Sequence, residues 1–283
     1  MLTFSRVFLI FLAYSFLGWC MEVIYVGLFV EHKFVNRGML HGPICPIYGF
    51  GGLIVLLGLE RWKDTWIELF FASMFLCSLL EYVTSWILEK LFQTKWWDYS
   101  DQKFNLNGRV CMLNSVLFGL GGMLFAHFVH PFVMWIVMAF SDTQAEWTAR
   151  GLSILLSTDI IITAGRLVNF SNTMSKLKEF TESLQERFAG AEWFRNESLS
   201  EMLASIRQQS QLHKEQFNQA LLDKVETFSR HQKNAESFLK RFPTMSSRTY
   251  TMPLSHIRTS LKAGIEERKA IAHARREARK QAE

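Results

Sequence analysis

Four carboxylates lie inside apolar stretches of this sequence, where an acidic side chain is costly. Glu22, Glu81, Glu89 and Asp159 each interrupt or border a long run of hydrophobic residues. An acidic residue at the centre of a membrane helix costs about 2.5–3.5 kcal/mol on insertion scales, so it faces a bundle interior, a water-filled cavity or a partner. These four side chains are therefore the first candidates for binding a ligand or an ion.

A loop of unusual composition follows the first carboxylate, in the segment FVNRGMLHGPICPIYGFGG that covers residues 34–52. Glycine permits positive φ angles, whereas proline fixes φ and removes a hydrogen-bond donor, so this pattern indicates a backbone of fixed shape. The candidates in it for binding a ligand or for clamping the loop are Asn36, Arg37, Gly38, His41, Gly42, Pro43, Pro46 and Tyr48.

A second polar loop follows the third apolar stretch and begins with the string WWDYS, residues 96–100. Trp and Tyr are enriched where a membrane meets water, so we expect Trp96 to be an interfacial anchor. Asp98, between two aromatic residues, is instead a candidate for lining a site. The candidates in this loop are Trp97, Asp98, Tyr99, Asn105 and Arg109.

Two interpretations of these charges stay open. In the first, acids and arginines pair around a ligand or ion in a polar cavity that opens inward. In the second, Glu22, Glu89, Arg37 and Arg109 form salt bridges that fix the loops. The strings Asn-Arg-Gly and Asn-Gly-Arg also suit ordinary turns, so we give the second interpretation the same weight as the first.

Enzymatic motifs are few. His41 and Cys45 share a loop, and Cys111 could lie near them, so a Cys–His nucleophile or a metal site is conceivable. Nothing in the sequence orients the histidine, however. The sequence contains no Walker A motif, no Rossmann glycine pattern and no HExxH motif. We therefore predict no cofactor and no metal site, and we favour a function other than catalysis.

Nearly all the long apolar runs lie before residue 171, which separates a membrane domain, 1–170, from a polar tail. A helix needs about 20 apolar residues to cross a membrane. The segment 132–140 is too short to cross and predicts a half-helix or an interfacial piece. The fold class is therefore all-α, a polytopic membrane helix bundle followed by a helical tail. The predicted spans are 7–30, 44–59, 65–92, 110–130 and 150–170.

Basic residues in the short loops predict the orientation. If the N-terminus is outside, the inner loops 31–43 and 90–109 hold six Lys and Arg residues and the outer segments hold four. Residues 171–283 carry 20 Lys and Arg against 14 Asp and Glu, so the basic tail then also lies in the cytoplasm. Anionic membrane lipid is the simplest partner for this tail, and we predict no nucleic acid partner.

An internal repeat is visible in the membrane domain. At an offset of 70, Phe34, Gly38, Gly49, Gly51 and Gly52 correspond to Phe104, Gly108, Gly119, Gly121 and Gly122. At an offset of 67, Trp19 and Glu22 correspond to Trp86 and Glu89. Spans one and two therefore look like a parallel duplicate of spans three and four. Binding sites of repeat-built transporters tend to lie where the repeats meet.

The tail has a different pattern. Apolar residues recur at steps of three and four through 171–242, which predicts amphipathic helix and a coiled coil or helical hairpin. Residues 243–253 form a breaker-rich linker, and the remainder of 243–283 predicts a basic C-terminal helix that is solvated or lies on lipid headgroups.

Several blocks of rare residues resemble a known family. The strings YSFLGWCMEVIY, FVNRGMLHGPICPIYGFGG, LLEYVTSWILEKLF, WWDYS and FNLNGRVC are similar to bacterial membrane proteins of the ABC-transporter type IV, or CmpB-like, permease family, over roughly residues 7–170. The resemblance implies a permease whose ATPase is a separate polypeptide. Besides the candidates named above, its motif positions here include Tyr14, Gly18, Trp19, Gly49 and Gly108.

Three functions are compatible with these observations. The first is a permease-like protein of the bacterial inner membrane that works with an ATPase subunit and, because five spans are few for a transporter, forms a homo-oligomer. The second is a membrane scaffold or sensor that acts through its tail. The third is a small intramembrane enzyme that acts on a lipid-linked substrate through Asp98, Arg37 and Arg109. The sequence does not identify the substrate.

Overall fold

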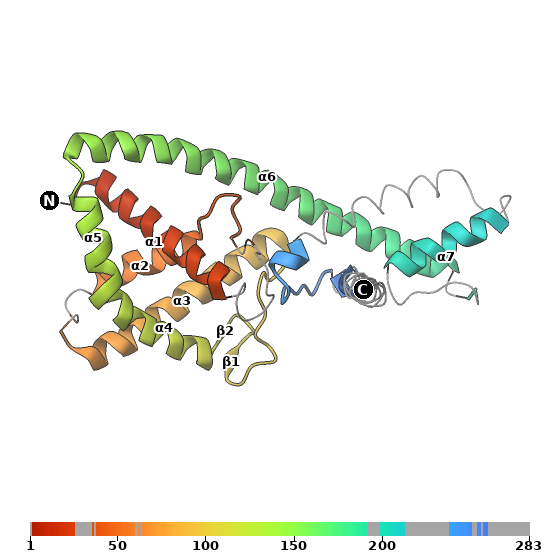
Figure 1. Ribbon diagram of the computed structural model, residues 1–283. Helices are drawn as coiled ribbons and strands as arrows, with labels where there is room; N and C mark the ends of the chain where they lie inside the picture. The colour runs from red at the N-terminus through yellow and green to blue at the C-terminus, as the bar shows by residue number, and fades with distance from the viewer. Residues whose placement is uncertain are drawn as a thin grey trace, which may run out of the picture. The chain divides into compact units, whose positions relative to one another are not determined.

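Helices dominate the part of the chain that the computed structural model describes, which comprises residues 2–25, 36, 38–59, 62, 64–188, 190–191, 199–212, 238–250, 254–255 and 257–259. The chain divides into two compact units, Met1–Val168 and Asn169–Glu283. Figure 1 shows the order of the elements along the chain. All the predicted site residues belong to the first unit.

Four helical segments are long and apolar enough to cross a membrane. Many of their large apolar side chains are exposed, for example Phe71 and Ile161 at 60% and 71%, which suits a surface that faces lipid. The prediction of an all-α chain with several membrane-spanning helices is therefore confirmed. The four segments are α1 (Phe4–Tyr25), α3 (Trp66–Phe92), the run Met112–Met138, and α6 (Asp142–Phe188).

The predicted second span corresponds to a shorter helix, α2 (Pro46–Leu59). Its 14 residues extend over about 21 Å, less than the roughly 30 Å of a bilayer core. α2 packs against α1 and α3. Backbone at membrane depth is tolerated where protein surrounds it, so a short α2 is acceptable in this position. The described residues thus contain four helical segments long and apolar enough to cross a membrane, and this shorter apolar helix.

The fourth predicted span was expected to end at His130-Pro131, and that prediction is wrong. Proline lacks an N–H and its ring clashes with the carbonyl four residues earlier. Here a π-helical turn precedes Pro131 and widens the helix, with the His130 N–H donating to the Phe125 carbonyl. Residues 132–138 therefore continue the span. The run consists of α4 (Met112–Leu124), η3 (Phe125–Val129) and α5 (His130–Met138).

Glycines allow the helices to pack closely. α1 packs against α2, and α3 packs against α4, as Figure 1 shows. A Cβ at Gly49 would overlap Ser15, and a Cβ at Gly122 would overlap Ser73. Small residues at such contacts are typical of helix pairs in membranes. The predicted internal repeat is not tested by these contacts and stays a prediction.

A short hairpin lies between α3 and α4. Its strands β1 (Asn105–Leu106) and β2 (Val110–Cys111) are antiparallel, with Asn105 opposite Cys111. Asn107 and Gly108 have φ angles of 56° and 68°, and the Arg109 N–H donates to the Leu106 carbonyl at 3.0 Å. Two left-handed residues in an Asn-Gly pair are typical of a type I′ turn.

The second unit contains the C-terminal part of α6, helix α7 (Leu199–Leu212) and residues 238–259. Met174, Leu177 and Leu184 are each no more than 1% exposed, so the predicted amphipathic pattern corresponds here to one buried helix face. The Ser175 and Tyr250 hydroxyls are hydrogen-bonded at 2.9 Å. The predicted coiled coil stays a prediction, and most of the predicted C-terminal helix lies outside the described residues.

Candidate functional site

Two hydrogen bonds between a tyrosine and a glutamate lie in the first unit. The Tyr48 hydroxyl, on α2, donates to Glu22 Oε1 on α1 at 2.6 Å. The Tyr99 hydroxyl, in the loop after α3, donates to Glu81 Oε1 on α3 at 3.2 Å. We call these four residues the tyrosine–glutamate cluster.

Both glutamates contribute to the electrostatic environment of Tyr99. Burial raises the pKa of Tyr99 well above its ordinary value, and the neighbouring charge of Glu81 raises it further. Cys111 and Glu22 contribute in the same direction, with smaller effects. Tyr99 therefore stays a neutral hydrogen-bond donor, and both carboxylates of the cluster act on it.

Glu81 is the most deeply placed acid of the cluster. Its residue is 7% exposed, and its second oxygen, Oε2, is buried without a hydrogen-bond partner. Ser85 lies four residues later on the same helix face, is 1% exposed, and its hydroxyl also has no hydrogen-bond partner. Within the part of the chain that the structure describes, neither Glu81 nor Glu22 forms an ion pair.

The loop that carries Tyr99 is held by its own side chains. Asp98 Oδ1 accepts from the Ser100 N–H at 3.0 Å and from the Ser100 hydroxyl at 2.5 Å. Asn105 Oδ1 accepts from the Gly108 N–H at 2.9 Å, and the Gly108 carbonyl accepts from the Tyr99 N–H at 2.8 Å. The Tyr99 backbone is therefore fixed from two sides.

Gly108 has two reasons to lack a side chain. Its φ of +68° lies in the left-handed region, and a Cβ there would overlap the Asp98 carboxylate and the Ser100 hydroxyl. The indole N–H of Trp97 donates to the next carbonyl, that of Arg109, at 3.0 Å. Trp97, Asp98, Asn105 and Gly108 thus shape the loop.

Arg109 connects this loop to α3. Its Nη2 lies 2.6 Å from Glu89 Oε2, and both side chains are largely buried, with exposures of 14% and 22%. The guanidinium also lies over the Tyr82 ring, 5.2 Å from its centroid. Arg109 therefore compensates Glu89 and links the loop to α3.

The loop before α2 is fixed in a similar way. Asn36 Oδ1 accepts from the Trp19 indole N–H and from the Gly38 N–H, both at 2.9 Å. The Cys45 N–H donates to the Ser15 carbonyl on α1 at 3.0 Å. Pro46 then begins α2, which brings Tyr48 to the glutamate of α1.

Asp159 on α6 clamps the same loop. Its Oδ1 accepts from the His41 N–H at 3.0 Å, and its Oδ2 accepts from the Gly42 N–H at 2.8 Å. His41 Nδ1 lies 3.1 Å from both Asp159 Oδ1 and the Thr163 hydroxyl. This carboxylate is therefore satisfied by loop backbone and is not free for a ligand. Pro43 lies exposed in the same loop.

Two further sequence expectations concern His41 and Trp96. His41 is oriented by Asp159, and a nucleophilic role with Cys45 or Cys111 stays a sequence hypothesis. Among the described residues no group of three His, Cys, Asp or Glu side chains could hold a metal ion. Trp96 is 1% exposed and packs edge-on against Phe92, so its prediction as an interfacial anchor is wrong. The indole instead forms part of the core under the second loop.

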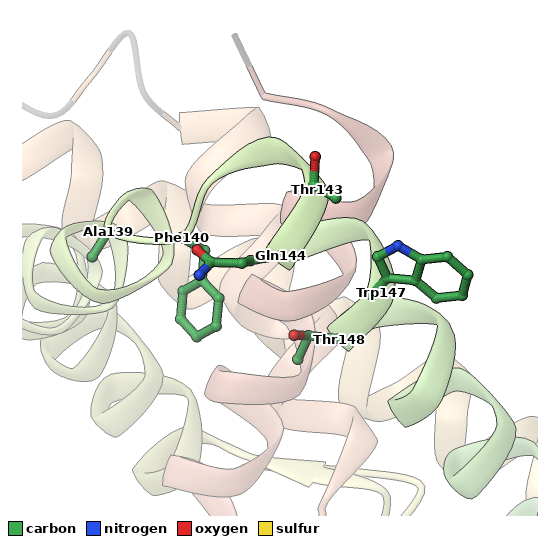
Figure 2. A pocket seen from close by; sticks show the side chains of 6 residues that line it. All are labelled: Ala139, Phe140, Thr143, Gln144, Trp147 and Thr148. Carbon is green, nitrogen blue, oxygen red and sulfur yellow. The ribbon is translucent and has the colours of Figure 1, made fainter.

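The hollow shown in Figure 2 lies elsewhere, at the turn between α5 and α6. It is open, its lining side chains are uncharged, and the Trp147 ring points away from the others. Arg6 at the start of α1 donates to the Phe140 carbonyl beside it at 3.0 Å. Glu22 is 16 residues further along α1, roughly 24 Å away by helix rise. The hollow is therefore separate from the cluster.

Comparison with known proteins identifies a family whose matched region includes the cluster. A family model described as "Putative ABC-transporter type IV" matches residues 9–164. The chain belongs to this type IV family. No curated protein and no solved structure matches it. The family match contains every member of the cluster and both loops, and it ends before the second unit.

The outcome for the predicted site residues is mixed within the type IV family region. The structure pairs Glu22 with Tyr48 and Glu81 with Tyr99. It assigns Glu89, Arg109 and Asp159 to contacts that fix the loops, and Arg37 lies outside the described residues. Sequence reasoning missed Ser85, Tyr82 and Thr163. The four-residue spacing from Glu81 to Ser85 was the available signal.

Proposed function

We propose that the chain is the permease subunit of an ABC-type transport system in the bacterial inner membrane, with its ligand site at the tyrosine–glutamate cluster. The observation that carries the proposal is the pair of carboxylates, Glu22 and Glu81, whose only described side-chain hydrogen-bond partners are tyrosine hydroxyls. Uncompensated acids inside a membrane bundle are costly and mark ligand or ion pathways.

The placement of the cluster supports this proposal. Glu22 and Glu81 lie in the C-terminal halves of α1 and α3, and the two fixed loops precede α2 and α4. All of these groups therefore lie toward one end of the bundle. With the predicted N-out orientation, that end faces the cytoplasm, where an ATPase subunit docks on an ABC permease. The family match supports such a partner.

A pull-down tests the proposal. The tagged chain is extracted from its own membranes in mild detergent, and the co-purifying proteins are identified and quantified by mass spectrometry. We expect a nucleotide-binding subunit in stoichiometric amount, lost from a variant that loosens the second loop, Asn105→Ala. A matched variant in an exposed helix position, Glu146→Gln, should retain it. Recovery of a homo-oligomer without any ATPase would contradict the proposed function.

A further inference from the structure

The charge of the cluster is not balanced by its described neighbours. Glu22 and Glu81 contribute two carboxylates. In the second loop, Arg109 is paired with Glu89 at 2.6 Å. Lys95, which is 8% exposed, donates to the Asn107 carbonyl at 2.9 Å. Burying charge without compensation costs several kcal/mol per ion, so a positive species is the expected complement.

The hydrogen-bonding groups of the cluster also indicate which class of ligand would complement them. Tyr48 and Tyr99 each use their single O–H on a carboxylate, so their oxygens can only accept further. Glu81 Oε2 is a buried acceptor with no partner, and the Ser85 hydroxyl is buried with none either. The Ser85 hydroxyl can donate or accept, whereas Glu81 Oε2 and the two tyrosine oxygens can only accept, so these groups favour a hydrogen-bond donor or a cation over an anion.

The donor set favours a monovalent species. Every available atom is a hard oxygen from a carboxylate, a phenol or an alcohol. The described residues offer no group of three His, Cys, Asp or Glu side chains for a metal ion, and divalent calcium takes six to eight oxygens, several of them carboxylate. Glu81 and Ser85 share one face of α3, so their free oxygens can meet a single small ion.

We propose that the tyrosine–glutamate cluster binds a small monovalent cation, an alkali-metal ion or an ammonium ion, between Glu81, Ser85 and the Tyr99 oxygen. This inference rests on the proposed function, because it names the class of ligand for the same site. The cation compensates the two carboxylates and supplies the missing partners of Glu81 Oε2 and the Ser85 hydroxyl.

Thermal unfolding of the purified full chain in detergent tests the inference. The melting temperature is measured in chloride salts of sodium, potassium, ammonium and N-methylglucamine at equal ionic strength, the last being too large for the site. We expect a saturable rise with at least one of the three small cations, because a ligand that binds only the folded state stabilises it. Equal melting temperatures in all four salts would overturn the proposal.

Variants locate the effect. Glu81→Gln should abolish the cation-dependent rise, and Ser85→Ala should weaken the apparent affinity roughly tenfold or more, since hydrogen bonds to charged groups contribute about 1.5–3 kcal/mol. Glu68→Gln, at an exposed position of the same helix, is the matched control and should retain the full rise. A rise that persists in Glu81→Gln, or one that depends on pH alone and not on the cation, would contradict cation binding. If Glu81→Gln does not fold, Ser85→Ala decides.

The two proposals can fail separately. Cation binding is measured on the isolated chain, whereas the permease function is tested by recovery of an ATPase. If an ATPase co-purifies with the chain but the melting temperature does not depend on the cation, the proposed function stands and this inference is wrong. A chain that binds the cation but recovers no ATPase loses the permease function and keeps the site.

Discussion

Single residues of the same type have different roles in this protein because their partners differ. Glu89 is paired with Arg109, and Asp159 accepts from two backbone N–H groups. Glu22 and Glu81 receive only tyrosine hydroxyls. A paired or fully hydrogen-bonded acid stabilises the fold, whereas a buried acid with a free oxygen costs stability. The hydrogen-bond and ion-pair partners of these acids therefore distinguish those that fix the loops from those that we propose bind a ligand.

Replacement of Tyr99 by Phe should remove the one side-chain donor to Glu81. Because the carboxylate then stays buried with neither oxygen satisfied, we expect the free energy of unfolding to fall by about 1–3 kcal/mol. Equilibrium unfolding in mixed micelles with increasing SDS measures this change. Tyr250→Phe, in the second unit, is a tyrosine control with a hydroxyl partner instead of a carboxylate. An unchanged stability of Tyr99→Phe would show that this hydrogen bond does not form.

Gly108→Ala should distort the second loop. The φ of +68° costs a residue with a side chain about 1–2 kcal/mol, and the overlap of the new Cβ with Asp98 adds to this. We expect a lower melting temperature and faster proteolysis between residues 93 and 111. Gly151→Ala, where a Cβ meets no other atom, is the control and should be neutral. Equal proteolysis of both variants would contradict the loop geometry.

At the scale of elements, the sequence predicted the helices better than their ends. Hydrophobic run length located α1, α3 and α6, because lipid requires long apolar segments. It failed at Pro131, because the π-helical turn that accommodates the proline has no characteristic amino-acid composition by which it could be predicted. It also failed at Trp96, because the order of residues does not reveal that this indole is buried and packs against Phe92. The Tyr–Glu pairing was not foreseen, because the partners lie on different elements.

The contact between α6 and the first loop is the clearest link between distant elements. Asp159→Asn replaces one acceptor oxygen with an N–H donor that faces another donor, so we expect a loss of about 1–3 kcal/mol in the free energy of unfolding and faster hydrogen exchange at residues 38–45. Hydrogen-exchange mass spectrometry measures this. The second loop, residues 93–111, should exchange as in the wild type. Unchanged exchange at 38–45 would show that Asp159 does not clamp the loop.

At the scale of the whole molecule, the order of helices predicts opposite sides for the two ends of the first unit. The N-terminus of α1 lies beside the turn between α5 and α6, since Arg6 pairs with Asp142 at 3.0 Å. If successive helices alternate in direction from α1 to α6, with α2 counted between α1 and α3, then α6 runs toward the end of the bundle that holds both loops. The order of helices does not identify which side is external, so the external N-terminus and the cytoplasmic tail stay a prediction from the basic residues of the loops.

Reporter fusions test that topology. A green fluorescent protein fused after the last residue should fluoresce, because it folds in the cytoplasm and not after export through the general secretory pathway. An alkaline phosphatase inserted at residues 62–65 should be active, because the account places this turn outside. Exchanging the two reporters is the internal control. An inactive phosphatase at 62–65 together with a non-fluorescent C-terminal fusion would reverse the orientation and the inward-facing site.

The melting temperatures of four glutamine or asparagine variants test the central claim most directly, that Glu22 and Glu81 form a site and that Glu89 and Asp159 hold the loops. The purified variants are compared in N-methylglucamine chloride, without any small cation. We predict that Glu81→Gln matches or exceeds the wild type, because it removes an uncompensated buried charge, and that Glu22→Gln, at a partly buried position, melts close to the wild type. Glu89→Gln and Asp159→Asn should melt at lower temperature, because each breaks a satisfied contact. A loss in Glu81→Gln as large as that in Glu89→Gln would show that the cluster is structural and would contradict the account.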